Sequence, residues 1–200
     1  MNLLALNRTE FGNPANEDNI PSLAEAEVLL NEWVKIDSLK RHMRQVGTLM
    51  RAWAAEREQL DDTEQQKWQI AGLLHDADWD QWPEQHCRKI IEELESREVA
   101  PSIIRAIASH GPSHFGVEPE TKMDKMLYAF DELSGLIHAY SLMRPTAYEG
   151  MQPKGVRKRL KDKSFAAQVS REDIRDASER AGIDLNELIT FIIQHQAAVA

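Results

Sequence analysis

The sequence predicts an all-α fold for its 200 residues. In segment after segment, apolar residues recur three and four positions apart, which is the spacing that places them on one face of a helix. Several of these segments begin at a serine, threonine or aspartate that is typical of a helix N-terminus. No segment shows the strict alternation of apolar and polar residues that indicates a half-buried strand.

The first predicted helix begins after Ser22, which forms a capping-box pattern with Glu25 ahead of an apolar stripe. Before it, residues 1–21 hold glycine, proline and asparagine without a sustained period, so we expect a loosely ordered lead-in. A second helix is expected to start at residues 37–38. Its apolar stripe contains a histidine, His42.

The third predicted helix opens at a capping box of Thr63 and Gln66 and arrives at His75 and Asp76. The stretch AGLLHDADWD at residues 71–80, where this helix ends, is unusual. Its run of apolar residues is followed closely by one histidine and three acids. Hydrophobic burial alone does not account for that gathering of polar groups.

Prolines mark the starts of the next two predicted helices, because proline suits the first helical turn. Pro83 is expected to open a helix that carries His86 on its apolar face. Pro101 is expected to open another that carries His110, and Gly111 to end it.

A long helix is predicted from about residue 121 to residue 142, with Asp131 on one side. Residues 144–164 form the longest stretch predicted to be irregular. Ser170 and Asp184 then begin two closing helices that are separated by a glycine. We therefore expect a single helical domain at residues 22–200, after the lead-in.

The composition is that of an ordinary globular protein, with 42% hydrophobic and 28% charged residues. No apolar run approaches the roughly 20 residues of a membrane span, and residues 1–10 lack the layout of a signal peptide. We expect a cytoplasmic protein. A net charge of −9 argues against broad binding to nucleic acid polymers or membranes, so small molecules are the expected partners.

A single cysteine, Cys87, excludes an internal disulfide and a thiolate-rich metal site. Any metal would therefore take nitrogen and oxygen ligands. Six such residues fall on, or at the end of, the apolar faces of five predicted helices: His42, His75, Asp76, His86, His110 and Asp131. One histidine so placed is usually a hydrogen-bonded core residue, but six together favour a divalent cation that satisfies them at once.

Three stretches carry a recognisable order of these residues: LKRHMRQV, IAGLLHDADWD and MLYAFDELSGLIHA. They resemble the HD-domain metal-dependent phosphohydrolase superfamily, whose signature is a histidine, a His-Asp pair and a distant aspartate on separate helices. The resemblance covers roughly residues 38–142 and implies a bundle of about seven to nine helices. Residues 143–200 would then be a C-terminal helical extension, of which VRKRLKDKSFAA resembles the tail of a bacterial subgroup.

The resemblance also implies a set of metal ligands. His42 corresponds to the first ligand, His75 and Asp76 to the pair, and Asp131 to the last. Many members bind a second metal through two intervening histidines, whose places are matched by His86 and His110. Asp76 would bridge the ions. This chemistry suits one or two ions of Mn, Fe, Ni, Co, Zn or Mg, which activate water and offset phosphoryl charge.

Other residues are candidates for catalytic roles beside Asp76. Asp78 follows the pair closely enough to orient a ligand or to act as a general acid or base, and a solvated loop carboxylate is the alternative. A basic run at residues 154–163 contains Lys161 and Lys163, which could clamp a phosphate, although charge runs are usually solvated faces. Trp79 and Trp82 are candidates for stacking on a base, or for packing in the core or at the rim.

Three functions agree with these features. The leading hypothesis is hydrolysis of a phosphomonoester or phosphodiester of a small molecule, such as a nucleotide, by metal-activated water. The second is a diiron HD-domain oxygenase, which needs nearly the same ligands. The third is a non-catalytic helical regulatory module with a structural metal.

Overall fold

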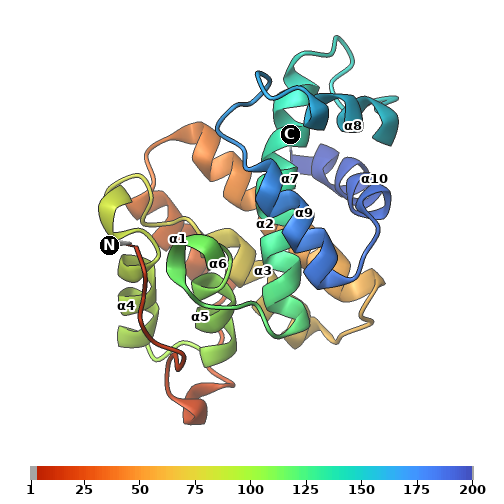
Figure 1. Cartoon of the computed structure of the whole chain (residues 1–200). Coiled ribbons are helices and arrows are strands. Elements are labelled where there is room, and N and C mark those ends of the chain that lie inside the picture. Colours follow the sequence, from red (N-terminus) through yellow and green to blue (C-terminus); the bar gives the residue numbers. More distant parts are fainter. Residues whose placement is uncertain (1–3, 200) are drawn as a thin grey trace.

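The computed structural model describes residues 4–199, and this part of the chain is entirely helical (Figure 1). It contains ten α-helices, one of them a single turn, together with three 3-10 helices, and within those residues no strand. The predicted all-α fold is confirmed. Residues 1–3 of the expected lead-in, and residue 200, lie outside the described part.

The α-helices are, in chain order, α1 Leu23–Trp33, α2 Asp37–Glu56, α3 Asp62–Leu74, α4 Arg88–Ser96, α5 Pro101–Ala108, α6 Pro112–Phe115, α7 Lys122–Leu142, α8 Pro153–Lys161, α9 Arg171–Ala181 and α10 Leu185–Gln196. The 3-10 helices are η1 Pro14–Asn16, η2 Pro83–Gln85 and η3 Ala197–Val199.

Several helix starts lie where the sequence predicts them. The side chain of Ser22 accepts a hydrogen bond from the Glu25 amide at 3.2 Å, and the Ser22 amide donates to the Glu25 carboxylate at 2.8 Å. Ser170 and Asp184 likewise cap α9 and α10 through their side chains. Each cap satisfies an amide that the helix itself leaves unpaired.

The start predicted for α3 lies later in the sequence than the observed one. Asp61, and not Thr63, is the N-cap, and its carboxylate accepts from the Glu64 amide at 2.9 Å. Thr63 and Gln66 lie within the first turns of the helix. Aspartate caps at least as well as threonine, so the earlier residue of the two begins the helix.

The helix expected at Pro83 is also placed differently. Pro83 opens only the 3-10 turn η2, and α4 begins five residues later at Arg88. Between them Cys87 has a φ of +66°, a left-handed conformation that interrupts any continuous helix. His86 therefore lies in a turn, and His110 lies two residues beyond the end of α5.

The irregular stretch predicted at residues 144–164 contains α8, a helix of nine residues with only Val156 buried. Its many basic residues obscure the short apolar pattern in the sequence. Figure 1 shows α8 at the far end of α7, away from α4 and α5.

The centre of the fold is the pair α2 and α3, which pack along each other, with α7 and α10 also against α2 (Figure 1). Gly47 on α2 faces Gly72 on α3 so closely that a Cβ on Gly72 would lie 2.9 Å from the Gly47 backbone. The two helices can therefore approach almost backbone to backbone. This contact sets the spacing between the segments that carry His42 and His75.

The C-terminal helices share this core. Phe191 and Ile192 of α10 are buried. The side-chain amide of Gln196, at the end of α10, donates to Gln45 of α2 at 2.8 Å and to the carbonyl of Ser134 of α7 at 3.1 Å. α10 is thus bonded to two of the helices that supply the site.

The described part of the lead-in packs on the domain although it has only one short helical turn. Phe11 is buried in the core, and the Leu6 amide donates to the carbonyl of Phe115 at 2.9 Å. None of the helices within residues 4–199 has the length and apolar character that crossing a membrane requires.

Candidate metal centre

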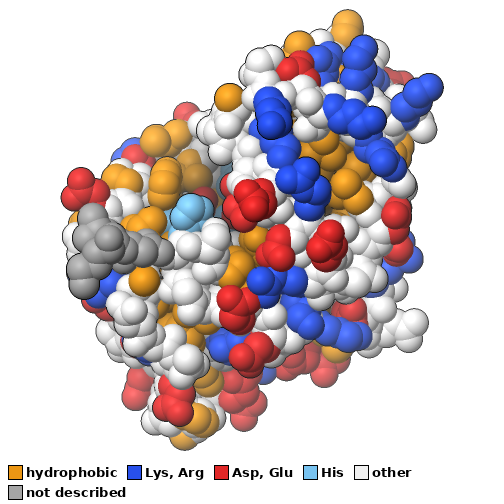
Figure 2. All heavy atoms as spheres, in the orientation of Figure 1, with side chains coloured by type: hydrophobic (Ala, Val, Ile, Leu, Met, Phe, Trp, Pro, Cys, Tyr) orange, Lys and Arg blue, Asp and Glu red, His pale blue; other side chains and the backbone are white. Residues whose placement is uncertain are grey.

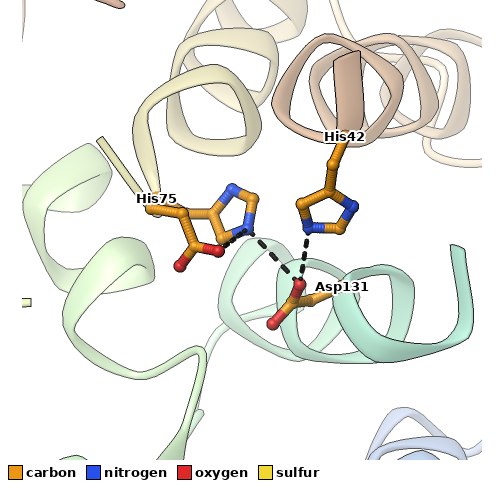
Figure 3. A group of neighbouring side chains, drawn as sticks. His42, His75 and Asp131 are labelled. Atoms are coloured by element: carbon orange, nitrogen blue, oxygen red, sulfur yellow. Dashed lines mark hydrogen bonds and ion pairs between the residues drawn. The ribbon is translucent and has the colours of Figure 1, made fainter. Parts of the chain in front are cut away.

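Three helices bring His42, His75 and Asp131 together from positions far apart in the sequence. His42 lies on α2, His75 directly follows α3, and Asp131 lies on α7. The Nε2 atoms of the two histidines lie 3.0 Å and 3.4 Å from Oδ1 of Asp131. Figure 3 shows both rings turned toward this carboxylate. Such convergence of fully or partly buried polar groups is what a shared ligand requires.

The orientation of His75 leaves one nitrogen for a ligand. Its Nδ1 atom donates to the Gly72 carbonyl at 2.8 Å, because a carbonyl can only accept. The ring is fully buried, and within residues 4–199 its Nε2 atom finds no hydrogen-bond partner. This nitrogen makes only long ion-pair contacts, with Asp131 at 3.4 Å and Asp76 at 3.6 Å, and a metal ion would satisfy it more closely. The residues present therefore fit a metal.

A second group consists of His86, His110 and Asp76. The Nε2 atoms of His86 and His110 lie 3.2 Å and 3.4 Å from Oδ1 of Asp76. His110 is oriented in the same way as His75, since its Nδ1 atom donates to the carbonyl of Ile107, three residues back. Its Nε2 atom therefore faces the group, as that of His75 does.

Asp76 joins the two groups. Its Oδ1 atom faces His86 and His110, whereas its Oδ2 atom lies 3.6 Å from Nε2 of His75. Within each group, every residue offers one nitrogen or oxygen atom, and these atoms all lie within 4.8 Å of one another. The six residues singled out in the sequence thus form two adjoining sets of metal-ligand type that share one carboxylate.

Asp78 lies behind the second group. Its side chain is fully buried and accepts from Nδ1 of His86 at 2.7 Å and from the Ile90 amide at 3.0 Å. It holds the His86 ring so that Nε2 faces Asp76. This is one of the two roles expected from the sequence. The other, general acid or base catalysis in contact with substrate, does not agree with complete burial.

Five residues of the two groups line a cavity of about 630 Å³: His42, Asp76, His86, His110 and Asp131. Its walls include Trp79, Phe115, Tyr128, Glu132 and Asp173. Figure 2 shows a histidine in a hollow beside several acidic side chains. Among the described residues, no lysine or arginine lines this cavity.

Comparison with known families agrees with this arrangement. Residues 39–136 match the family model of the HD domain. The chain is an HD-domain protein. This region spans α2 to most of α7 and contains all six residues of the two groups. No curated protein and no solved structure matches the chain at a comparable level.

In the HD domain, the close approach of histidines and acids favours protonated imidazoles beside ionised carboxylates. Burial disfavours charge on His75 and His86, but the neighbouring carboxylates outweigh it and raise their pKa values to about 9 and about 10. Burial likewise opposes ionisation of Asp76 and Asp131, but the adjacent histidines hold the pKa of each carboxyl below its usual value. The ligand sets contain ionised carboxylates, as cation binding requires.

The structure does not bring Lys161 and Lys163 to the cavity. Both side chains are exposed, and neither lines it. In Figure 2 the basic side chains gather at the end of the molecule where α8 lies. The placement agrees with the solvated-face alternative for this run and not with a clamp over the histidines.

Three wall residues were not singled out from the sequence. Tyr128 lies one turn before Asp131 on the same face of α7, a spacing that could have indicated it. Glu132 follows Asp131 directly, and burial together with the nearby Asp131 raises its pKa to about 8. Asp173 comes from α9, outside the matched HD region, and no local pattern indicates that α9 returns to the site.

We predict that Asp78→Ala selectively weakens the second group. Removing the acceptor of the His86 Nδ1 proton frees the ring, which commonly lowers metal affinity about 10- to 100-fold. Calorimetric metal titration should show one weakened site and one retained site. Asp80→Ala is the matched control, because Asp80 accepts from the Lys35 amide and contacts no histidine. Equal affinities in the two variants would contradict the assignment.

Proposed function

We propose that this HD-domain protein is a metal-dependent phosphohydrolase that cleaves a phosphate ester of a small molecule. The observation that carries the proposal is the carboxylate of Asp76, whose two oxygens face two separate histidine groups beside a cavity. A cavity of about 630 Å³ is within the range of small-molecule sites.

In this proposal His42, His75 and Asp131 hold one divalent cation, and His86 and His110 hold a second. Asp76 would serve both, because one of its oxygens faces each group. The imidazole and carboxylate ligands suit Mn, Fe, Co, Ni or Zn, and the buried Cys87 belongs to neither group. When bound, such cations supply Lewis-acid activation of water and neutralise charge on the phosphoryl group.

The protein's own side chains then position the reacting groups. The carbonyls of Gly72 and Ile107 and the carboxylate of Asp78 hold three imidazoles in fixed orientations. Because no described lysine or arginine lines the cavity, a chain of several phosphates would lack cationic partners along its length. The geometry therefore favours an ester with one phosphate group, and a nucleotide substrate would be a monophosphate.

The proposal is tested by measuring metal content and phosphate release together. Protein purified without a metal-binding tag should contain up to two equivalents of metal and should hydrolyse members of a panel of phosphomonoesters and phosphodiesters. Activity should disappear on chelation and return with Mn²⁺ or another divalent ion. Full activity in metal-free protein, or no release from any ester with any of these metals, would exclude the proposed chemistry.

We also predict that metal binding releases protons and strengthens as pH rises. In the metal-free protein the pKa values of His75 and His86 are about 9 and about 10, so both rings are protonated at pH 7. Ligation needs their Nε2 lone pairs, so loading should release about two protons at pH 7. Affinity should increase with pH until it passes these pKa values.

Titration calorimetry in buffers of different ionisation enthalpy measures the number of protons released. In His86→Ala this number should fall by about one, because one protonated ligand is gone. Binding that is independent of pH between 6 and 8 would contradict the prediction.

A further inference from the structure

We infer that the part of the substrate that is not phosphate is apolar, an alkyl or aryl group, and that it lies against one side of the cavity. This side, the apolar rim, is formed by Leu4, Ile36, Trp79 and Phe115. The inference rests on the proposed function and specifies the substrate class of the same site. It comes from the exposure of the rim residues and from the contacts that hold them together.

Two members of the apolar rim are unusually exposed for their residue types. Trp79 is 46% exposed and Ile36 is 48% exposed, and both line the cavity. Within residues 4–199 only six large apolar side chains are exposed, so finding two of them at one cavity is notable. Exposed apolar side chains at a concave site are typical of a surface that a ligand covers.

One part of the rim joins the start of α2 to the turn that follows α3. The carboxylate of Asp80 accepts from the Ile36 amide at 3.2 Å, so Ile36 lies beside the turn that carries Trp79. Trp82 of the same turn packs edge-on against Trp33, with ring centroids 4.8 Å apart, and is not among the described residues that line the cavity. Trp79 is therefore the tryptophan that faces a ligand.

The other part of the rim surrounds the imidazole of His86. The rings of Trp79 and Phe115 pack against this imidazole, with centroid distances of 5.0 Å and 5.2 Å. The carbonyl of Phe115 accepts from the Leu6 amide at 2.9 Å, and this bond holds the segment whose Leu4 lines the cavity. The apolar rim thus adjoins the second metal-ligand group.

This position indicates what covers the rim. Figure 2 shows hydrophobic side chains on one side of the histidine in the hollow and acidic side chains on the other. If metal ions bind the phosphate, the organic part of the same molecule extends to the side of the cavity. Covering apolar surface with alkyl or aryl carbon releases water and favours binding, whereas acidic side chains offer no such gain.

A nucleoside is the competing occupant, because Trp79 could stack on its base. The polar edges of a base or a sugar also need hydrogen-bond partners, and the side chains of Leu4, Ile36 and Phe115 provide none. Stacking therefore accounts for the tryptophan alone. An apolar group accounts for all four rim residues.

A series of straight-chain esters tests the inference: ethyl, butyl and hexyl phosphate, whose alcohols are almost equally good leaving groups. With the metal-loaded protein, kcat/KM should rise by up to about fourfold for each methylene that reaches the rim, the factor that corresponds to burying one methylene. Hexyl phosphate should therefore exceed ethyl phosphate by about tenfold or more. Because the measurement is a ratio within one protein, a general loss of activity cancels.

Substitutions in the rim should change this ratio. Leu4→Ala and Trp79→Gln should each reduce the hexyl-to-ethyl ratio by about threefold or more, whereas Trp79→Phe keeps an apolar ring and should retain most of it. Leu142→Ala is the matched control for Leu4→Ala, because Leu142 is 70% exposed and is not among the described residues that line the cavity. An equal reduction in Leu142→Ala would overturn the role of the rim.

Calorimetric binding of ethylphosphonate and hexylphosphonate gives a second reading, which does not depend on turnover because neither compound has an ester bond. Hexylphosphonate should bind more tightly. Its binding should also have the more negative change in heat capacity, which is the robust sign of apolar burial.

The two measurements distinguish the inference from the proposed function. Equal kcat/KM for ethyl and hexyl phosphate, or a higher value for nucleoside monophosphates than for hexyl phosphate, would overturn the inference and leave the phosphohydrolase intact. Cleavage of no ester, combined with tighter binding of hexylphosphonate, would overturn the phosphohydrolase and retain the apolar rim as a binding site. Equal binding of the two phosphonates without any cleavage would overturn both.

Discussion

Replacing Asp76 with alanine is expected to remove both equivalents of bound metal and to lower phosphate release by on the order of a thousandfold or more. The expectation follows from the two oxygens of Asp76, which face the His75 group on one side and the His86 and His110 group on the other. Metal ions contribute several kcal/mol to such reactions, and each 1.4 kcal/mol corresponds to about tenfold in rate. Elemental analysis and a phosphate-release assay measure the two effects.

Two variants make this result specific. His86→Ala removes a ligand from only one group, so it should lose about one equivalent and keep the other. Asp18→Ala removes an exposed carboxylate outside both groups and should keep both. Circular dichroism should show the same helical content in all three proteins. If Asp76→Ala retained two equivalents, the shared role of this carboxylate would be wrong.

Replacing Gly72 with alanine is expected to destabilise the protein by about 1–3 kcal/mol and to reduce its metal content. The new Cβ would lie 2.9 Å from the backbone of Gly47 and of Val46, and backbone cannot move aside as a flexible side chain can. To relieve the contact, α2 and α3 must separate. Since these helices carry His42 and lead into His75, the ligands would separate with them.

Denaturant unfolding of the metal-free protein measures the stability change, and elemental analysis measures the metal. Gly135→Ala is the matched control, because it lies inside α7 and a Cβ there would meet nothing within 4 Å. It should stabilise the protein by about 0.5–1 kcal/mol, the usual gain of alanine over glycine in a helix. Stabilisation by both substitutions would show that the α2–α3 contact is not close.

The local rules of helix formation account for most of the fold that the sequence predicts. Ser22, Ser170 and Asp184 begin helices as expected because a cap depends on a few adjacent residues. The same rules were misapplied at the start of α3, where Asp61, and not the expected Thr63, is the N-cap. They also failed near Cys87, whose left-handed backbone depends on packing rather than on its residue type.

The six residues of the two groups could be selected from the sequence because each is a polar residue at an apolar helical position. Such a position implies a partner, and the order of the residues supplied the resemblance to the HD domain. Which partner each of these residues contacts could not be predicted in this way. That Asp78 holds His86 from behind, fully buried, depends on a turn whose shape the sequence does not indicate.

The sequence by itself determined the all-α class, most helix starts and the residues of the metal-ligand groups, because these follow from periodicity and capping within short segments. Only the tertiary structure decided what surrounds those groups. It placed Lys161 and Lys163 away from the cavity and brought Asp173 of α9 to its wall. The physical reason is that α8 and α9 are positioned by packing against α7, a long-range contact that no local pattern records.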